Sequence, residues 1–383
     1  MVVLEKALLV PPLRFKGFTG NWNEVSLKQL LTPIERKTKK PAESYTSIGI
    51  RSHFKGTMQR YDTDPKSNSM EYLYLVHKDD FILNITFAWE GALAIAREED
   101  DLGYVSHRFP TYRVNEDIVT KEFFQYLYPT ERMKYNLRNI SPGGAGRNRV
   151  LNKRDFLKLK VKIPETDEQN KISEFMRSLE DWIQNLKSQK EELEKYKKGM
   201  MQKIFSQEIR FKDGNGKDYP DWKDVKFKDI FVVGSGKDYK HLQSGDIPVY
   251  GTGGYMTSVN DYLYEGESVG IGRKGTIDKP IFLKNKFWTV DTLFYTHSFK
   301  GVLPYFVFLL FQNVNWKKYN EASGVPSLSK NTLYTIKTRV PSIDEQNKII
   351  ALFTSLEDLT SSKQNQIEKA EMWKKGLLQE MFV

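Results

Sequence analysis

Apolar residues recur in alternating steps of three and four along two long stretches of the chain. In the first they are Ile172, Phe175, Leu179, Trp182, Leu186, Leu193, Tyr196 and Met200, with Gln189 as the one polar position. In the second they are Ile349, Leu352, Leu356, Leu359, Ala370, Trp373 and Leu377, with Lys363 and Gln366 as polar positions. This spacing predicts a coiled-coil stripe on two helices of about 40 residues each. Because helices this long cannot bury their stripes alone, we expect them to pair antiparallel within one chain; pairing between two chains is the alternative.

The two stretches belong to an internal repeat with an offset of 177 residues. PETDEQNKISEFMRSLED from Pro164 returns as PSIDEQNKIIALFTSLED from Pro341, and YKKGMMQKIF from Tyr196 returns as WKKGLLQEMF from Trp373. A weaker similarity is found at the start of the two halves, between RFKGFTG from Arg14 and RFKDGNG from Arg210. Between these pieces the halves differ. The repeat therefore divides the chain into a first globular domain at 1–163, a central helix at 164–206, a second globular domain at 207–340 and a C-terminal helix at 341–383.

The globular segments have the pattern of mixed α/β domains. Aromatic and β-branched runs at 72–76, 82–89 and 279–297 predict strands, and the stretches 121–135 and 303–319 predict shorter helices. We therefore expect an α+β protein in which two mixed α/β domains are separated by two long antiparallel helices, with a pseudo-twofold internal repeat.

The positive charge lies in the globular segments. The chain has 59 basic and 49 acidic residues, a net charge of +10, of which the globular segments carry +13 and the helical segments −3. Phosphate-binding domains joined by a neutral spacer would divide their charge in this way, and a chance excess of surface lysines is the alternative.

Composition and local motifs exclude several kinds of site. The absence of Cys rules out disulfides and thiol chemistry, and no apolar run approaches the ~20 residues of a membrane span, so we expect a cytoplasmic protein without a signal peptide. The GxGxxG match at 270–275 precedes a predicted strand instead of a helix, and GSGKD at 234–238 lacks the outer residues of a phosphate loop. We predict no catalytic residue, no metal ligand and no cofactor.

The doubled DEQNKI and SLED segments, the KKGxxQ endings, the RFKG and RFKDG openings and the IGRKGTI and FWTVDTLFY stretches resemble the specificity (S) subunit of type I restriction-modification systems, over nearly the whole chain. The resemblance implies that 1–163 and 207–340 are target-recognition domains, each reading one half of a split double-stranded DNA site, and that the paired helices set their separation. It implies two methylation subunits docked on the helical regions and separate restriction subunits as partners. S-adenosylmethionine, ATP and magnesium are then expected only on those partners, which methylate adenine and cleave DNA.

Candidate DNA-contacting residues lie in two kinds of turn. Arg273 and Lys274 stand between glycines in the second domain, and Trp89 and Glu90 occupy the corresponding turn of the first. The segments before the long helices offer Arg147, Asn148 and Arg149 in the first domain and Ser327, Ser329 and Lys330 in the second; Arg108, Lys240 and His241 are weaker candidates. For each residue a solvated turn is the alternative. For the whole chain the alternatives are a stand-alone nucleic-acid enzyme or a scaffold for an acidic protein.

Overall fold

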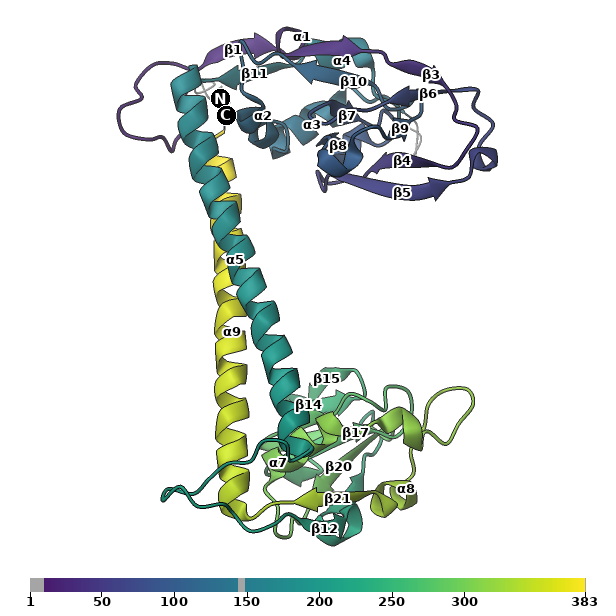
Figure 1. The fold of residues 1–383 in the computed structure, drawn as a ribbon, viewed down its shortest axis with the longest axis vertical. Helices are drawn as coiled ribbons and strands as arrows, with labels where there is room; N and C mark the ends of the chain where they lie inside the picture. Colours follow the sequence, from purple (N-terminus) through teal and green to yellow (C-terminus); the bar gives the residue numbers. More distant parts are fainter. Residues whose placement is uncertain (1–9, 144–148, 383) are drawn as a thin grey trace. The chain divides into compact units, whose positions relative to one another are not determined.

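The structure is a computed structural model and describes residues 10–143 and 149–382. The chain divides into two compact units. Unit 1 comprises Met1–Asn185 together with Gln366–Val383, and unit 2 comprises Leu186–Asn365. Each unit contains both strands and helices, which confirms the expected α+β class (Figure 1).

In its described residues, unit 1 has three sheets. The first pairs β1 (Asn23–Ser26) with β11 (Lys160–Ile163). The second has the order β2 (Leu31–Ile34), β10 (Thr111–Val114), β7 (Phe81–Leu83), β8 (Leu93–Ile95). The third has the order β3 (Lys37–Lys39), β6 (Tyr72–Leu75), β9 (Tyr104–Val105), β4 (Tyr45–Ile50), β5 (Thr57–Thr63). The shorter helices are α1 (Leu27–Leu30), α2 (Lys121–Leu127), α3 (Glu131–Asn139) and α4 (Lys153–Lys158), with 3-10 turns η1 (Pro65–Ser67), η2 (Ala88–Glu90) and η3 (Glu98–Asp100).

Unit 2 repeats this plan with small changes. One sheet pairs β12 (Lys223–Lys226) with β21 (Lys337–Val340). A second has the order β13 (Val232–Ser235), β20 (Leu293–His297), β17 (Ser268–Gly272), β18 (Ile281–Leu283). A third has the order β15 (Gly254–Val259), β14 (Ser244–Gly251), β19 (Lys286–Thr289), β16 (Tyr264–Glu265). The shorter helices are α6 (Phe227–Ile230), α7 (Pro304–Asn313) and α8 (Lys330–Thr335), with the 3-10 turn η4 (Trp316–Tyr319).

The two long helices contribute to both units. α5 (Thr166–Phe205) has 40 residues and α9 (Ile343–Glu380) has 38. The first half of α5 lies with the end of α9 in unit 1, where Glu180 and Lys374 form an ion pair of 2.5 Å. The second half of α5 lies with the start of α9 in unit 2, where Lys197 and Glu357 form an ion pair of 2.6 Å. This order is antiparallel, as predicted (Figure 1).

The buried stripe on these helices is displaced from the predicted one. On α5 the buried apolar positions are Ile172, Met176, Leu179, Ile183, Leu186, Met201 and Ile204, and on α9 they include Ile349, Phe353, Leu356, Ile367, Ala370 and Leu377. Trp182, Tyr196, Leu359 and Trp373, which we had expected in the seam, are about half exposed. The prediction was wrong at these four positions because each helix carries an apolar face wider than a two-helix seam can cover.

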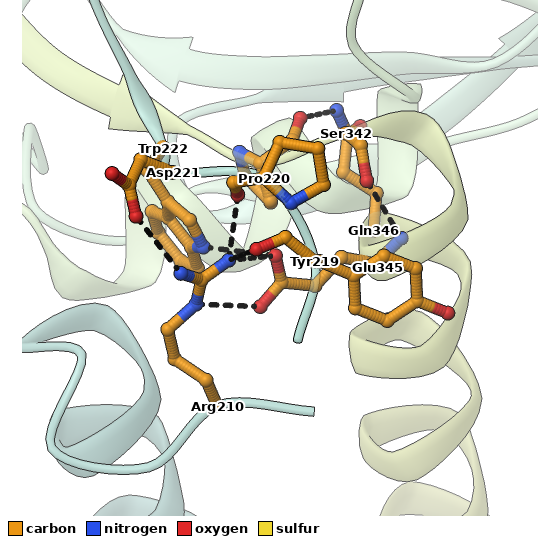
Figure 2. Close-up of polar contacts among 9 residues, drawn as sticks. Arg210, Tyr219, Pro220, Asp221, Trp222, Ser342, Glu345 and Gln346 are labelled. Carbon is orange, nitrogen blue, oxygen red and sulfur yellow. Dashed lines mark hydrogen bonds and ion pairs between the residues drawn. The ribbon is translucent and has the colours of Figure 1, made fainter. Parts of the chain in front are cut away.

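A buried carboxylate at the start of each long helix explains why the openings of the two halves repeat. In unit 2 the Glu345 side chain, 1 % exposed, accepts hydrogen bonds from Arg210 Nη2 at 2.8 Å and Nε at 3.3 Å and from Trp222 Nε1 at 3.2 Å. Figure 2 shows the guanidinium also donating to the carbonyl oxygens of Tyr219 and Pro220. The RFKDG opening is thereby fixed to the DEQNKI helix start.

Unit 1 contains the matching arrangement. Arg14 Nε and Nη2 each donate to the buried Glu168 carboxylate at 2.6 Å. The indole Nε1 of Trp22, the counterpart of Trp222, is buried without a hydrogen-bond partner among the described residues. Within residues 10–143 and 149–382, Arg14 is therefore the only side chain that donates to the carboxylate of unit 1, whereas the carboxylate of unit 2 has a second donor residue.

Candidate nucleic-acid interface

In unit 2 the turn between β17 and β18 packs against the segment that precedes α8. Leu328 N donates to Arg273 O at 2.9 Å, Gly275 N donates to Pro326 O at 2.9 Å, and Lys274 and Ser327 form an isolated β-bridge. Gly275 has φ = +89°, a conformation that favours glycine, which explains the glycine after the two basic residues. The two segments, more than 50 residues apart in sequence, together border one open cleft.

This cleft has a volume of about 430 Å³ and gathers five of the predicted residues, Ser329 among them. Arg273, Lys274, Ser327 and Lys330 line it together with Ser235, Phe294, Glu321, Leu328 and Ser329. The Arg273 guanidinium and the Lys330 ammonium each lie 5.9 Å from the centre of the Phe294 ring. Within the described residues none of the three cations forms an ion pair. Like charges held this close favour binding of an anion or of a group rich in hydrogen-bond acceptors.

The one carboxylate in the cleft is engaged by the loop itself. Glu321 Oε1 accepts a hydrogen bond from Ser329 N at 3.0 Å, and hydrogen bonds from Thr332 and Ser329 lower the pKa of this carboxyl group. The Ser329 hydroxyl accepts from Thr332 N and caps α8. Glu321 therefore stabilises the loop that presents Lys330 and leaves the cations available.

A half-buried histidine lies beside this cleft. His297 stacks near Tyr295 and Tyr264, with ring centres 5.7 and 5.9 Å away. Burial lowers the pKa of His297, and the Lys330 charge lowers it further. The imidazole is therefore held in its neutral form at neutral pH, and it adds no positive charge to the cleft.

Lys240 and His241 lie elsewhere in unit 2. They are exposed in the connection between β13 and β14, and the His241 ring packs at 5.9 Å against the ring of Trp288. Neither residue lines the cleft of Arg273. Their proposed DNA contact stays a prediction.

In unit 1 the equivalent loop between β7 and β8 brings together three other predicted residues. The Arg149 guanidinium lies 5.2 Å from the centre of the Trp89 ring. Trp89 Nε1 donates to Thr86 O at 3.2 Å, and Arg108 Nη1 donates to Thr86 Oγ1 at 3.3 Å. Arg147 and Asn148 lie outside the described residues.

The loops of the two units correspond in their backbone contacts. Leu151 N donates to Ile85 O at 2.8 Å, which matches the Leu328 and Arg273 contact of unit 2. Gly91, like Gly275, has a positive φ, at +83°. Unit 1 has the longer loop because it contains η2, and Glu90 at the end of η2 takes the place that Lys274 has before its glycine.

A second cleft in unit 1 contains residues that the sequence did not point to. It has a volume of about 600 Å³ and is lined by Ser47, Ile48, Gly49, Ile50, Ser52, Met58, Arg60, Asn84, Phe87, Glu90 and Phe109. Glu90 Oε2 accepts a hydrogen bond from Ser52 Oγ at 2.7 Å. Only Glu90 among these residues was singled out from the sequence. The others lie in strands and loops whose local patterns give no sign that they face one cleft.

The part of the chain that the structure describes contains no group of three or more His, Cys, Asp or Glu side chains that could hold a metal ion. Within the same residues, no helix is both long enough and apolar enough to cross a membrane.

Comparison with known proteins identifies the repeated regions. The family model of the type I restriction modification DNA specificity domain matches residues 19–195 and again residues 219–371. The MjaVIII type I restriction enzyme specificity subunit of Methanocaldococcus jannaschii is 23% identical over 294 residues, which cover 66% of this chain and 68% of the relative. The EcoprrI specificity subunit of Escherichia coli is 27% identical over 116 residues, which cover 30% of this chain and 29% of the relative.

Solved structures share the fold over almost the whole chain. The S subunit of a type I restriction-modification system from M. genitalium aligns with a TM-score of 0.57 at 16% identity, covering 98% of this chain and 99% of the other. The HsdS subunit from Thermoanaerobacter tengcongensis aligns with a TM-score of 0.53 at 14% identity, covering 94% and 96%.

Proposed function

The chain belongs to the type I restriction-modification DNA specificity family and is a non-catalytic specificity subunit, and we propose that each unit reads one half of a bipartite DNA site. One observation carries this proposal. The contact between the β7–β8 loop and the segment before α4 is rebuilt in unit 2 between the β17–β18 loop and the segment before α8. In unit 2 this contact gathers Arg273, Lys274 and Lys330, which form no ion pair with any residue that the structure describes. Such side chains are those that phosphate oxygens or a guanine edge would engage.

The lengths of α5 and α9 support a second part of the proposal. Each helix is continuous and supplies residues to both units. A helix rises about 1.5 Å per residue, so the number of helical residues between the two domains would determine the spacer tolerated between the half-sites. Spacer length would then be part of the recognised sequence.

We propose that the exposed apolar positions on the long helices bind the methylation subunits. Phe175, Trp182, Gln189 and Tyr196 are seven residues apart on α5, and Leu352, Leu359, Gln366 and Trp373 are their repeat counterparts on α9. Trp182 and Trp373 are 46% and 50% exposed in unit 1, and Tyr196 and Leu359 are 52% and 51% exposed in unit 2. Heptad spacing suits an additional amphipathic helix, so a helical segment of the partner fits this face.

The remaining activities would belong to the partners. In this proposal the methylation subunits carry S-adenosylmethionine and methylate adenine, and restriction subunits with ATP and magnesium cleave DNA, all in the cytoplasm. The specificity subunit itself would hold no cofactor.

Mapping of modified adenines tests the proposal. Genomic DNA from cells that express this chain with its methylation subunits should contain one bipartite methylated sequence, with two specific halves and a spacer of fixed length. Methylation of a single continuous site, or modification that does not depend on this chain, would contradict it.

A matched pair of variants tests the docking face. Trp182→Ser should weaken capture of the methylation subunits by the purified chain, whereas Glu191→Ser, an exposed polar position on the same helix, should not. Equal capture by both variants would exclude this face as the docking site.

A further inference from the structure

The equivalent loops of the two units carry opposite charges. In unit 2 the residues before the left-handed glycine are Arg273 and Lys274, and in unit 1 they are Trp89 and Glu90. The Trp89 ring is engaged by Arg149, and of these two residues Glu90 is the one that lines the 600 Å³ cleft. The two units therefore present chemically opposite groups from the same place in the fold.

One oxygen of the Glu90 carboxylate is available to accept a hydrogen bond from a ligand. Its Oε2 is held by the Ser52 hydroxyl at 2.7 Å, and its Oε1 has no hydrogen-bond partner among the described residues. Within the same residues Glu90 forms no ion pair, although Arg60 lines the same cleft. Phe87 and Met58, each 36% exposed, provide apolar walls.

The backbone beneath Glu90 is tightly held. His53 N donates to Glu90 O and Phe54 N donates to Gly91 O, both at 2.8 Å. A Cβ atom at Gly91 would lie only 3.0 Å from the Phe54 ring, so the turn is packed against that ring. A carboxylate on such a support is held in place before a ligand arrives, as specific recognition requires.

A carboxylate facing DNA repels phosphates, so its favourable partner is a hydrogen-bond donor on a base edge. Two exocyclic amino groups are exposed in the major groove. The N6 amino group of adenine lies beside the acceptor N7 of the same base, which repels a carboxylate, whereas cytosine itself presents only the N4 amino group and no acceptor in the major groove. We propose that Glu90 accepts a hydrogen bond from cytosine N4 in the half-site read by unit 1, with Ser52 as a positioning residue. This inference rests on the proposed function and names one base pair of its target.

The test uses the complete complex of this chain with its methylation subunits. Glu90→Gln replaces the carboxylate by an amide that can accept from adenine N6 and donate to N7. In the methylation map of this variant we expect the preference for one base pair to weaken at a single G·C position of one half-site. Discrimination against adenine at that position should fall about tenfold or more, and the other half-site should stay unchanged. Glu98→Gln, which removes an exposed carboxylate on η3 outside the cleft lining, is the matched control and should leave the map unchanged.

A map for Glu90→Gln identical to that of the wild-type complex would overturn the inference, and so would relaxation at an A·T position. If Glu90→Gln does not assemble, Ser52→Ala provides the test, because it leaves the carboxylate in place and frees its orientation. It should relax the same G·C position to a smaller degree, and an unchanged map would count against the idea. A wild-type complex without any bipartite site would instead refute the proposed function.

Discussion

Removal of the arginine from each buried ion pair should destabilise its unit by a different amount. In unit 2, Arg210→Met removes the two hydrogen bonds from the guanidinium to the Glu345 carboxylate together with the positive charge that pairs with it, and Trp222 remains as a donor. Loss of one partner of a buried ion pair costs about 3–5 kcal/mol. Because a donor remains and the arginine side chain is 21% exposed, we expect the low end, about 3 kcal/mol, for this variant.

Removal of the corresponding arginine in unit 1 should lower the unfolding free energy by more. Arg14→Met removes the Nε and Nη2 donors to Glu168, whose side chain is 2% exposed, and in the described part of the chain the Trp22 Nε1 has no partner of its own. We expect about 5 kcal/mol. In calorimetry of the full chain, a loss of about 3 kcal/mol in a unit of this size lowers its melting temperature by roughly 6–12 °C.

The control and a compensating variant make the reasoning refutable. Arg339→Met changes an exposed arginine on β21 of unit 2 and should shift the melting temperature by no more than a degree or two, since exposed substitutions cost about 0.5 kcal/mol or less. Arg210→Met with Glu345→Gln should recover most of the loss, because the neutral amide can still accept from the indole of Trp222. If Arg210→Met behaves like Arg339→Met, or if the double variant is less stable than Arg210→Met, the buried carboxylate does not need its arginine.

Three other measurements follow from the structure. The first is an insertion of seven residues in α5 between Leu186 and Leu193, with its equivalent in α9, which adds about 10 Å of helix. The tolerated spacer should then be about three base pairs longer, and neither half-site should change. An unchanged spacer in the methylation map would exclude the role of helix length. The second concerns Arg273→Ala and Lys330→Ala. If the removed cation contacts a phosphate, the slope of log K for DNA binding against log salt should decrease in magnitude by about 0.9. If it contacts guanine, the sequence preference at one base pair should be lost with little change in slope, and anisotropy titrations of the assembled complex distinguish the two results. The third concerns His297, whose pKa in the folded chain lies below its ordinary value. Its contribution to stability is therefore present above pH 6.5 and is lost as the pH falls through the folded pKa. The unfolding free energy of His297→Gln should accordingly decrease less than that of the wild type as the pH is lowered.

The sequence predicted those features that depend on periodicity and on the chemistry of turns. The repeated stripes located both long helices. Flanking glycines led to Arg273 and Lys274, and the segment SGVPSLSK led to Lys330; the structure gathers these three residues in one cleft. Each of these three residues lies in a tight turn or next to a helix start, where few conformations are available, and their contact with DNA stays a prediction.

Other features depend on residues distant in the sequence and had no local signal. Glu345 stands in the first turn of its helix, where any acidic residue complements the helix dipole, and its partner Arg210 is 135 positions away. The seam was misplaced because the exposed Trp182 is a large apolar side chain like its buried neighbour Ile183. Spacing alone does not show which side of a wide apolar face meets the other helix.

The ion pairs between the long helices have a consequence for how such a chain could arise. Glu180 pairs with Lys374, the counterpart of Lys197, and Lys197 pairs with Glu357, the counterpart of Glu180. An ancestral polypeptide with one copy of the repeat could make both bonds by associating with a second copy of itself, as in any isologous homodimer. Tandem fusion of two such genes would need no new contact residue. After the fusion, the β7–β8 loop and the β17–β18 loop could change independently of each other. The difference between Glu90 and Lys274 is what such freedom would produce.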